Sequence, residues 1–165
     1  MLLIRHIQDH DSLSALTDLL HRGYARLGAM GLNYTAVNQS IDTTRARISG
    51  GHCLLAYWDG GLVGTVLAKP PEDDCECIHF RRPDVSSLRQ FAVEPSMQGQ
   101  GIGRTLIQRC EAWAIKQGYR ELALDTAKPA VHLVDLYTRL GYKHVGSVQW
   151  PGKVYQSIVM AKPLQ

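Results

Sequence analysis

The sequence has few cysteines and no long hydrophobic run. Its four cysteines (Cys53, Cys75, Cys77 and Cys110) show no disulfide-framework spacing among 165 residues, which excludes a disulfide-rich secreted domain. The apolar stretch at the start ends at Arg5, whereas a membrane span needs about 20 residues and a signal peptide also needs a longer run. These absences predict a protein without membrane partners in a reducing, cytoplasmic location.

The sequence also lacks a strong excess of charge of either sign. Its 18 Lys and Arg residues exceed its 15 Asp and Glu residues by 3, and they are scattered rather than clustered, so no nucleic-acid partner is expected. Hydrophobic residues make up 45% and charged residues 20%, which are globular proportions. No repeat or low-complexity stretch interrupts the chain, and we expect one domain over residues 1–165.

Apolar periodicity and turn residues outline alternating strands and helices. Apolar runs predict strands at 2–7, 53–58, 62–67, 88–93, 121–125, 142–148 and 153–160. Helical spacing and end signals predict helices from an Asp9 or Asp11 cap through Leu27, from Asp42 through Arg47, at 101–117 and at 130–140. Residues 59–61 predict a hairpin turn and polar residues 70–86 an excursion between strands. This order of elements predicts an α/β or α+β sheet domain.

A glycine-rich turn, Gln98-Gly99-Gln100-Gly101-Ile102-Gly103-Arg104, lies between an expected strand and an expected helix. Alternate glycines let the backbone turn sharply and approach a ligand, while the N–H groups of the first helical turn are available to an anion such as a phosphate. The dinucleotide pattern G-x-G-x-x-G fails because Arg104 and Leu106 stand where glycine is needed, and no P-loop Gly-Lys-Ser/Thr follows. A tight turn that binds nothing is the alternative.

Three segments in order resemble the GNAT superfamily of N-acetyltransferases. Gln98, Gly101 and Gly103 match its pyrophosphate-binding pattern, Gln/Arg-x-x-Gly-x-Gly/Ala. Residues 88–95 resemble its fourth strand, and residues 136–142 (Leu-Tyr-Thr-Arg-Leu-Gly-Tyr) resemble its segment of tyrosine, leucine, glycine and an aromatic residue. Because the signatures are ordered and separated as in the family, they are more specific than one glycine loop.

The resemblance, which runs from about residue 86 to 146, implies the arrangement of the fold and the cofactor site. It implies a mixed, mostly antiparallel sheet of about six or seven strands, splayed at the fourth strand and flanked by about four helices. Pantetheine of acetyl-CoA would dock against Phe91, Ala92 and Val93, with a main-chain N–H near Val93 polarising the thioester carbonyl as an oxyanion hole does. The amides that would hold the pyrophosphate are those of Gln98, Gly99, Gln100, Gly101, Ile102, Gly103, Arg104 and Thr105.

Tyr137 matches the family position whose hydroxyl protonates the departing coenzyme A thiolate. A phenol suits this role because it is protonated at neutral pH and donates a short hydrogen bond. The alternative is a tyrosine that serves only the core, since leucines share its helix face. The sequence departs from the family seven positions earlier, where Ala130 stands in place of an asparagine found in many relatives.

The base that takes a proton from the incoming amine is predicted to be Glu94. This residue follows the fourth strand, whose end would lie near the thioester. A solvated loop carboxylate is the alternative for Glu94. Asp125, His79, His132 or a chain of water molecules are other possible bases, although Asp125 equally suits a cap for the next turn.

The excursion at residues 70–86 holds two further patterns. Cys75-x-Cys77-x-His79 is a partial set of metal ligands, but structural zinc takes four, so no metal is expected. Acidic residues at 72–76 suit a cationic acceptor if they overhang the site, and a solvated loop is the alternative.

The resemblance implies an enzyme that transfers an acetyl group from acetyl-CoA to a small-molecule or protein amine. The amine attacks directly in a ternary complex, and the sequence has neither a Gly-x-Ser-x-Gly elbow nor an evidently activated cysteine for a covalent intermediate. A non-catalytic acyl-CoA-binding or sensing module on the same fold is the alternative. The sequence leaves the oligomeric state open, with a homodimer paired through the C-terminal strands as one arrangement.

Overall fold

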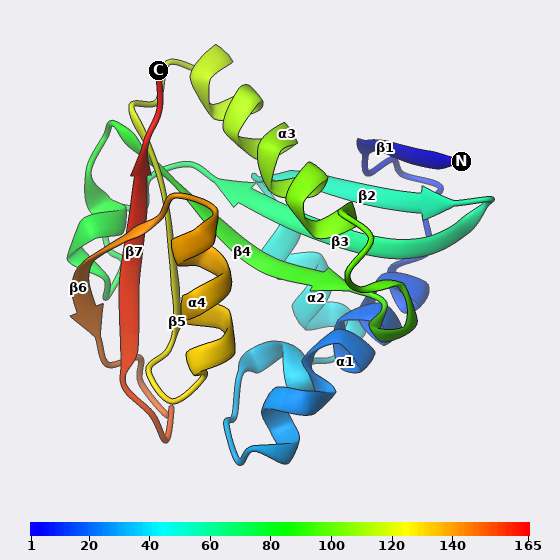
Figure 1. Cartoon of the computed structure of the whole chain (residues 1–165), viewed down its shortest axis with the longest axis horizontal. Helices are drawn as coiled ribbons and strands as arrows, with labels where there is room; N and C mark the ends of the chain where they lie inside the picture. Colours follow the sequence, from blue (N-terminus) through cyan, green and yellow to red (C-terminus); the bar gives the residue numbers. More distant parts are fainter. The chain divides into compact units, whose positions relative to one another are not determined.

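The computed structural model describes all 165 residues and contains a seven-stranded sheet and four α-helices (Figure 1). The strand order is β1-β2-β3-β4-β5-β7-β6. The strands are β1 (Leu2–His6), β2 (His52–Trp58), β3 (Gly61–Lys69), β4 (Val85–Val93), β5 (Glu121–Ala127), β6 (Lys143–Val148) and β7 (Ser157–Pro163). The helices are α1 (Leu13–Ala29), α2 (Ile41–Ile48), α3 (Ile102–Lys116) and α4 (Val131–Arg139). The expected α/β class with a mixed sheet is confirmed.

Two compact units make up the chain, one of residues 1–69 and 89–110 and the other of residues 70–88 and 111–165. Each unit therefore draws on both halves of the sequence, and β4 and α3 each contribute residues to both. The expectation of a single domain over residues 1–165 stays a prediction. None of the helices combines the length and apolar character needed to cross a membrane.

The first unit contains an antiparallel sheet of β1, β2 and β3. The long hairpin of β2 and β3 turns at Asp59 and Gly60, whose φ angles are +48° and +86° (Figure 1). Two successive positive φ angles match the right-handed twist of the flanking strands, so the predicted hairpin is confirmed. Its core combines buried residues of α1, the hairpin, β4 and the short helical turn at Thr35–Val37, namely Leu16, Leu20, Ala36, Cys53, Leu55, Leu67 and Ala92.

The caps of α1 and α2 differ from those predicted. Ser12 caps α1 and Ser40 caps α2, and each side chain accepts a hydrogen bond from a main-chain N–H three residues later. Asp11 is not the cap of α1 because its carboxylate is bonded to the Arg5 guanidinium. Asp42 lies inside the first turn of α2, where a negative charge still favours the helix N-terminus.

The second unit contains β5, β7 and β6, which pair antiparallel, together with the start of β4, which pairs parallel to β5. β4 begins at Val85 rather than at residue 88. The sequence missed this start because residues 85–88 are buried on both faces and therefore lack the apolar–polar alternation that marks a half-exposed strand. β7 begins at Ser157 rather than at residue 153, because residues 151–152 form a turn that the N–H of Lys153 closes on the Trp150 carbonyl. Both predicted starts were wrong by a few residues.

The ladder between β4 and β5 is short. It pairs residues 85–87 of β4 with residues 121–123 of β5 and ends there, so Leu88 and Leu124 are not partners.

Candidate functional site

The glycine-rich turn leads from β4 into α3 in the first unit. Gly99 and Gly101 have φ angles of +81° and +84°, a region in which a side chain would be strained. No atom lies within 4 Å of a Cβ built at either position, so backbone conformation, not crowding, requires glycine there. Residues 98–101 are all exposed. The turn therefore presents its main chain directly to solvent.

Gly103 is required for a different reason. A Cβ at this position would lie 2.8 Å from Cζ of Phe91 and 3.4 Å from Cγ2 of Val93. A real Cβ does not approach another carbon within 3 Å, so glycine lets the first turn of α3 pack directly on β4. Gln98 adds a second link to the strand, since its Nε2 donates a hydrogen bond to the Val93 carbonyl at 3.3 Å.

The first turn of α3 offers main-chain donors. Its hydrogen-bonded ladder begins with the N–H of Thr105, which donates to the Gly101 carbonyl at 3.0 Å. The N–H groups of Ile102, Gly103 and Arg104 precede that first bond and are available to a ligand. Arg104 is exposed and places a cation on the same turn, where the helix dipole already favours an anion. Thr105 contributes less, because its hydroxyl already donates to the Gly101 carbonyl at 2.9 Å.

The end of β4 carries a kink that the sequence did not predict. Gln90 has a φ of +50°, which is rare for a residue other than glycine, and its side chain is buried. Two residues later, a Cβ built on Gly23 of α1 would lie 2.8 Å from the Cβ of Ala92. β4 is thus bent at Gln90 and closely covered by α1 at Ala92. No local pattern marks the kink, because nothing about glutamine favours positive φ.

Glu94 follows β4 and is paired with Arg22 of α1. Arg22 Nε and Nη2 lie 2.8 and 2.7 Å from the Glu94 Oε2 atom, and the hydrogen bond raises the pKa of the guanidinium. The carboxylate is held mostly inside the surface, with 21% of its side chain exposed, while 48% of the Arg22 side chain is exposed. The ion pair fixes the position of the Glu94 carboxylate beside α1. Arg22 is a partner that sequence reasoning missed, because it lies 72 positions away.

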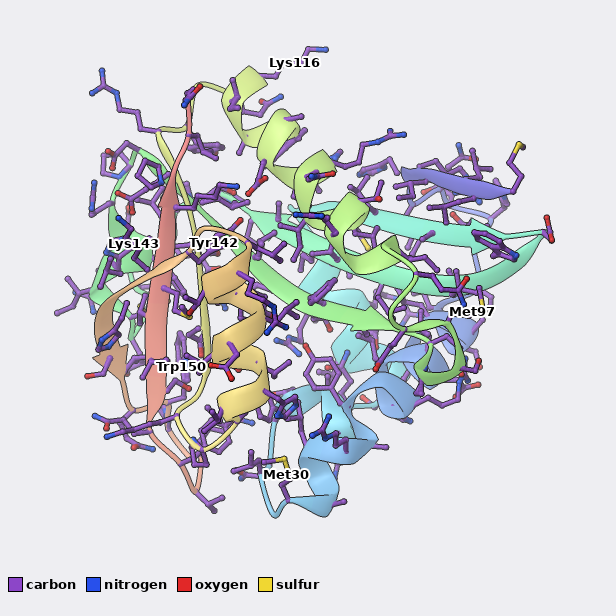
Figure 2. All side chains as sticks on the ribbon, in the orientation of Figure 1. Met30, Met97, Lys116, Tyr142, Lys143 and Trp150 are labelled. Carbon is purple, nitrogen blue, oxygen red and sulfur yellow. The ribbon has the colours of Figure 1, made fainter.

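Tyr137 lies on α4 in the second unit and is buried, with 8% exposure. Its ring meets the ring of Tyr142 edge-on, with centroids 6.3 Å apart. The Tyr142 hydroxyl donates to Glu111 at 3.0 Å, and Lys162 Nζ lies 2.9 Å from the same carboxylate oxygen (Tyr142 is labelled in Figure 2). The neighbouring aromatic ring is therefore held in place by a charged hydrogen-bond network.

Ala130 precedes α4 at the position where the sequence departs from the family pattern. It is fully buried, and the helix has no side-chain cap at its N-terminus. Its own N–H donates to the Ala127 carbonyl at 2.9 Å. Main-chain hydrogen bonds alone stabilise the start of this helix. Residue 130 has no polar side chain that could contact a ligand.

The alternative bases have structural partners in the second unit. Asp125 accepts a hydrogen bond from the indole N–H of Trp150 at 2.7 Å (Trp150 is labelled in Figure 2). His79 Nε2 lies 2.6 Å from the Glu121 carboxylate, within a side-chain pair that is largely covered. Each group serves a local contact within this unit.

The Cys75-x-Cys77-x-His79 segment does not gather ligands. Both cysteines are buried in a hydrophobic cluster with Phe80 and Val85, and burial raises the pKa of the Cys77 thiol. His79 is bonded to a carboxylate instead. No three His, Cys, Asp or Glu side chains lie close enough together in the structure to hold a metal ion.

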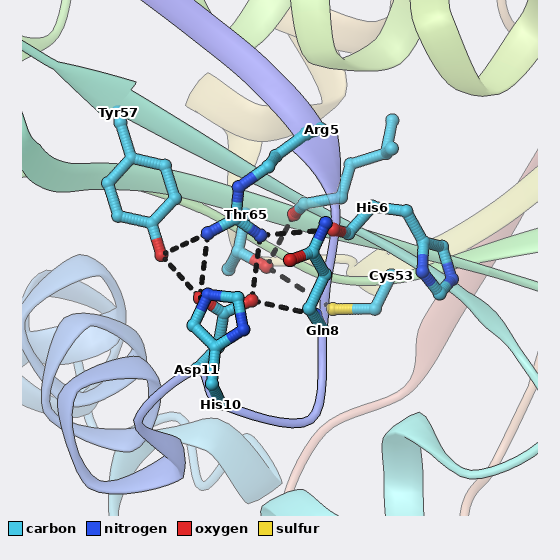
Figure 3. A network of polar contacts seen from close by, with 9 residues as sticks. Arg5, His6, Gln8, His10, Asp11, Cys53, Tyr57 and Thr65 are labelled. Atoms are coloured by element: carbon cyan, nitrogen blue, oxygen red, sulfur yellow. Dashed lines mark hydrogen bonds and ion pairs between the residues drawn. The ribbon is translucent and has the colours of Figure 1, made fainter.

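A second polar network in the first unit joins β1, β2 and the start of α1 (Figure 3). Two Arg5 nitrogens bond both carboxylate oxygens of Asp11 at 2.7 Å, and the Tyr57 hydroxyl donates to Asp11 at 3.1 Å. The Arg5 guanidinium also lies 4.9 Å from the centroid of the Tyr57 ring. Because each polar side chain in this network has a hydrogen-bond partner, the network stabilises the segment that connects β1 to α1.

Comparison with known proteins places these features in a family. A model of the acetyltransferase (GNAT) family matches residues 16–142. An S-(2-succino)cysteine N-acetyltransferase from Bacillus subtilis is 26% identical over 155 residues, covering 91% of this chain and 89% of the relative.

Solved structures with low sequence identity share the fold. The ribosomal-protein-S18-alanine N-acetyltransferase from Escherichia coli superposes with a TM-score of 0.75 at 19% identity, covering 100% of this chain and 95% of that one. A GNAT family acetyltransferase from Elizabethkingia anophelis with acetyl-CoA bound superposes with a TM-score of 0.70 at 16% identity, covering 99% and 98%.

Proposed function

The chain belongs to the GNAT family of acetyltransferases, and on that premise we propose that it acetylates a primary amine by direct attack in a ternary complex. The amine nitrogen attacks the carbonyl carbon of acetyl-CoA, and the carbon–sulfur bond then breaks. The amine loses a proton and the departing thiolate gains one. The products are an N-acetylated amine and coenzyme A.

The glycine-rich turn is the observation that carries the proposal. Positive φ angles at Gly99 and Gly101 expose the main chain, and three N–H groups of the first turn of α3 precede its hydrogen-bonded ladder. We assign the pyrophosphate of acetyl-CoA to residues 98–105, with Arg104 as an additional cation. The close contact of Gly103 with Phe91 would hold the cradle at a fixed distance from β4.

The end of β4 is the proposed place of the thioester. Pantetheine would lie along Phe91, Ala92 and Val93, and a main-chain N–H near Val93 would donate to the carbonyl oxygen as negative charge develops there. The kink at Gln90 supports this role, because it redirects the main chain immediately before these residues.

Tyr137 is the proposed acid that protonates the thiolate. Its burial supports the role, since a phenol held away from water donates a stronger hydrogen bond to a nearby thiolate. The ordered neighbour Tyr142 restricts the ring. These contacts also suit a purely structural tyrosine, so the test has to separate the two roles by rate.

Glu94 is the proposed base. Arg22 Nη2 lies 2.7 Å from its Oε2 atom, so the ion pair holds the carboxylate in place after β4. The proton leaves the amine either directly to Glu94 or through a chain of water molecules that ends there. Replacing Arg22 with methionine is expected to lower kcat, because the carboxylate loses this positional restraint.

The acceptor is proposed to be a small-molecule or protein amine. Two observations favour acceptor molecules of opposite charge. Asp73, Asp74 and Glu76 are exposed, and the acidic stretch would favour a cationic amine if it overhangs the site. The name of the Bacillus subtilis relative instead specifies S-(2-succino)cysteine, an amino acid that carries a succino group. Charge reversal at Asp73 and Asp74 should raise KM for a polyamine and lower it for an anionic amino acid.

The first experiment measures thiol release from acetyl-CoA with a panel of polyamines, aminoglycosides, amino acids and lysine peptides. Amine-dependent release, reduced at least about a hundredfold in Tyr137→Phe without loss of folding, would support both the transfer and the acid. Leu133→Met serves as a control on the same helix. Thermal stabilisation by acetyl-CoA without thiol release from any amine would favour the sensing module instead.

We further propose a cytoplasmic protein with no nucleic-acid or membrane partner that pairs with a second copy through its C-terminal strands. The low net charge of +3 supports the first part. β6 supports the second, because it is an edge of the sheet and an edge strand presents unpaired main-chain groups. Sedimentation at several concentrations would test the pairing.

A further inference from the structure

A buried polar chain in the first unit leads to the kink of β4. Gln39, between α1 and α2, is 5% exposed, and its Nε2 donates to the side-chain oxygen of Gln90 at 2.7 Å. The same Nε2 donates to Thr44 Oγ1 at 2.8 Å. Arg47 Nη1 donates to Gln39 Oε1 at 2.8 Å, and His21 Nε2 lies 2.7 Å from the Gln39 carbonyl. Both ends of the Gln39 amide are thus engaged.

Arg47 determines which atoms donate and which accept in this chain of hydrogen bonds. Arginine has donors and no acceptor, so the Gln39 atom facing Arg47 has to be the oxygen. The Gln39 nitrogen then faces Gln90, and the atom of Gln90 that receives its proton has to be the oxygen. Arg47 therefore orients Gln39, and Gln39 orients Gln90.

Gln90 is a strained residue. Its φ of +50° lies in the left-handed region, which non-glycine residues occupy only where the surroundings hold them there. Its side chain is 5% exposed, and the hydrogen bond from Gln39 joins it to the segment that precedes α2. The strain occurs one residue before Phe91, where the proposed oxyanion donors begin.

We propose that Gln39 is a positioning residue for acetyl transfer. Its amide holds Gln90 in the left-handed conformation and thereby fixes the direction of the main-chain N–H groups of residues 91–93. This inference rests on the proposed function. Gln39 touches neither acetyl-CoA nor the amine in this scheme and acts through the backbone of β4 alone.

The test is a double-mutant cycle with methionine, which nearly matches glutamine in length but forms no such hydrogen bonds. Gln39→Met and Gln90→Met should each lower kcat about tenfold, because a small displacement of a catalytic donor is costly. KM for acetyl-CoA should change less than about twofold, since the pyrophosphate turn is untouched. The double variant should be no slower than either single variant, because both remove one interaction.

Thr17→Val is the matched control. Thr17 is 2% exposed and its Oγ1 lies 2.7 Å from Thr44 Oγ1, so the variant disturbs the same buried cluster without breaking the bond to Gln90. It should lower Tm while kcat is kept. Should Gln39→Met fail to fold, Gln39→Asn tests the same bond by shortening the side chain.

Parental kcat in the single variants, multiplied losses in the double variant, or an equal loss in Thr17→Val would each overturn the role of Gln39. Absence of thiol release from the parent protein with every amine would overturn the proposed function itself, together with this role. The two failures are distinguishable, because the first requires an active parent.

Discussion

At the scale of single residues, the functional turn depends on what its glycines leave out. Gly99 and Gly101 relieve backbone strain, whereas Gly103 leaves room for the Phe91 ring. The sequence marked all three as a glycine-rich turn, with only Gly101 and Gly103 in the family pattern, but did not separate these two causes. The two causes predict different effects of substitution. Any side chain at Gly99 or Gly101 strains the backbone of that residue, whereas the effect of a side chain at Gly103 also depends on the size of residue 91.

Gly103→Ala should weaken acetyl-CoA binding. Alanine favours a helix over glycine by about 1 kcal/mol, but a Cβ at 2.8 Å from the Phe91 ring forces a displacement that costs about 1–3 kcal/mol. We expect KM for acetyl-CoA to rise about tenfold and stability to fall slightly. Gly146→Ala is the control, because it has ordinary φ and no atom within 4 Å of its Cβ, and it should change neither quantity.

Arg5→Met should make stability less dependent on acid. The hydrogen bond from Arg5 holds the pKa of the Asp11 carboxyl well below its usual range. The unfolded chain takes up this proton near pH 4, so the stabilisation is complete above that pH and is lost as the pH falls toward the lowered value. Arg5→Met should lower Tm by about 5 °C at pH 7 and by less at pH 3, and the difference should narrow further as the pH falls. An equal difference at both pH values would exclude this ion pair as the cause.

At the scale of elements, hydrophobic spacing located the helices, but their caps required three-dimensional information. Aspartate and serine both cap helices well, and the sequence predicted Asp9 or Asp11 as the cap of α1 rather than Ser12. The structure selects Ser12 because Arg5 engages Asp11. The start of β4 was missed for a related reason, since a strand buried on both faces has no alternating pattern.

Ser12→Ala should destabilise the protein by about 1 kcal/mol through loss of the α1 cap. The Ser12 hydroxyl oxygen accepts a hydrogen bond from the Ala15 N–H at 3.0 Å, and alanine has no acceptor. Denaturant unfolding measures the change. Asp9→Ala is the control, because Asp9 is exposed and was one of the two caps expected from the sequence. It should leave the unfolding midpoint unchanged. A similar loss of stability in Asp9→Ala would show that Asp9 also supports the helix.

At the scale of the whole molecule, the sequence predicted the order of elements and the glycine-rich turn before α3 because both have local signals. It predicted neither Gln90 as a kink nor Arg22 and Gln39 as partners of β4. Arg22 lies 72 positions from Glu94, and Gln39 lies 51 from Gln90, so only folding brings them together. Their roles follow from contacts, for which a single sequence carries no pattern.

Ligand fragments should stabilise the folded chain according to whether they carry a pyrophosphate. Coenzyme A at 100 times its Kd should add about 2.7 kcal/mol, which corresponds to a rise in Tm of about 5–10 °C. ADP should give a smaller rise, and adenosine at the same concentration should give almost none. If adenosine matched ADP, the turn at residues 98–105 would not be the pyrophosphate cradle.

The contact between Phe91 and Gly103 also constrains how this sequence can diverge. The family pattern allows glycine or alanine at the last position of the motif, but here alanine at 103 would crowd the aromatic ring at 91. Relatives that carry alanine at that position are therefore expected to favour a smaller residue in place of Phe91. An evolutionary path that first reduces the size of the strand residue avoids this crowding.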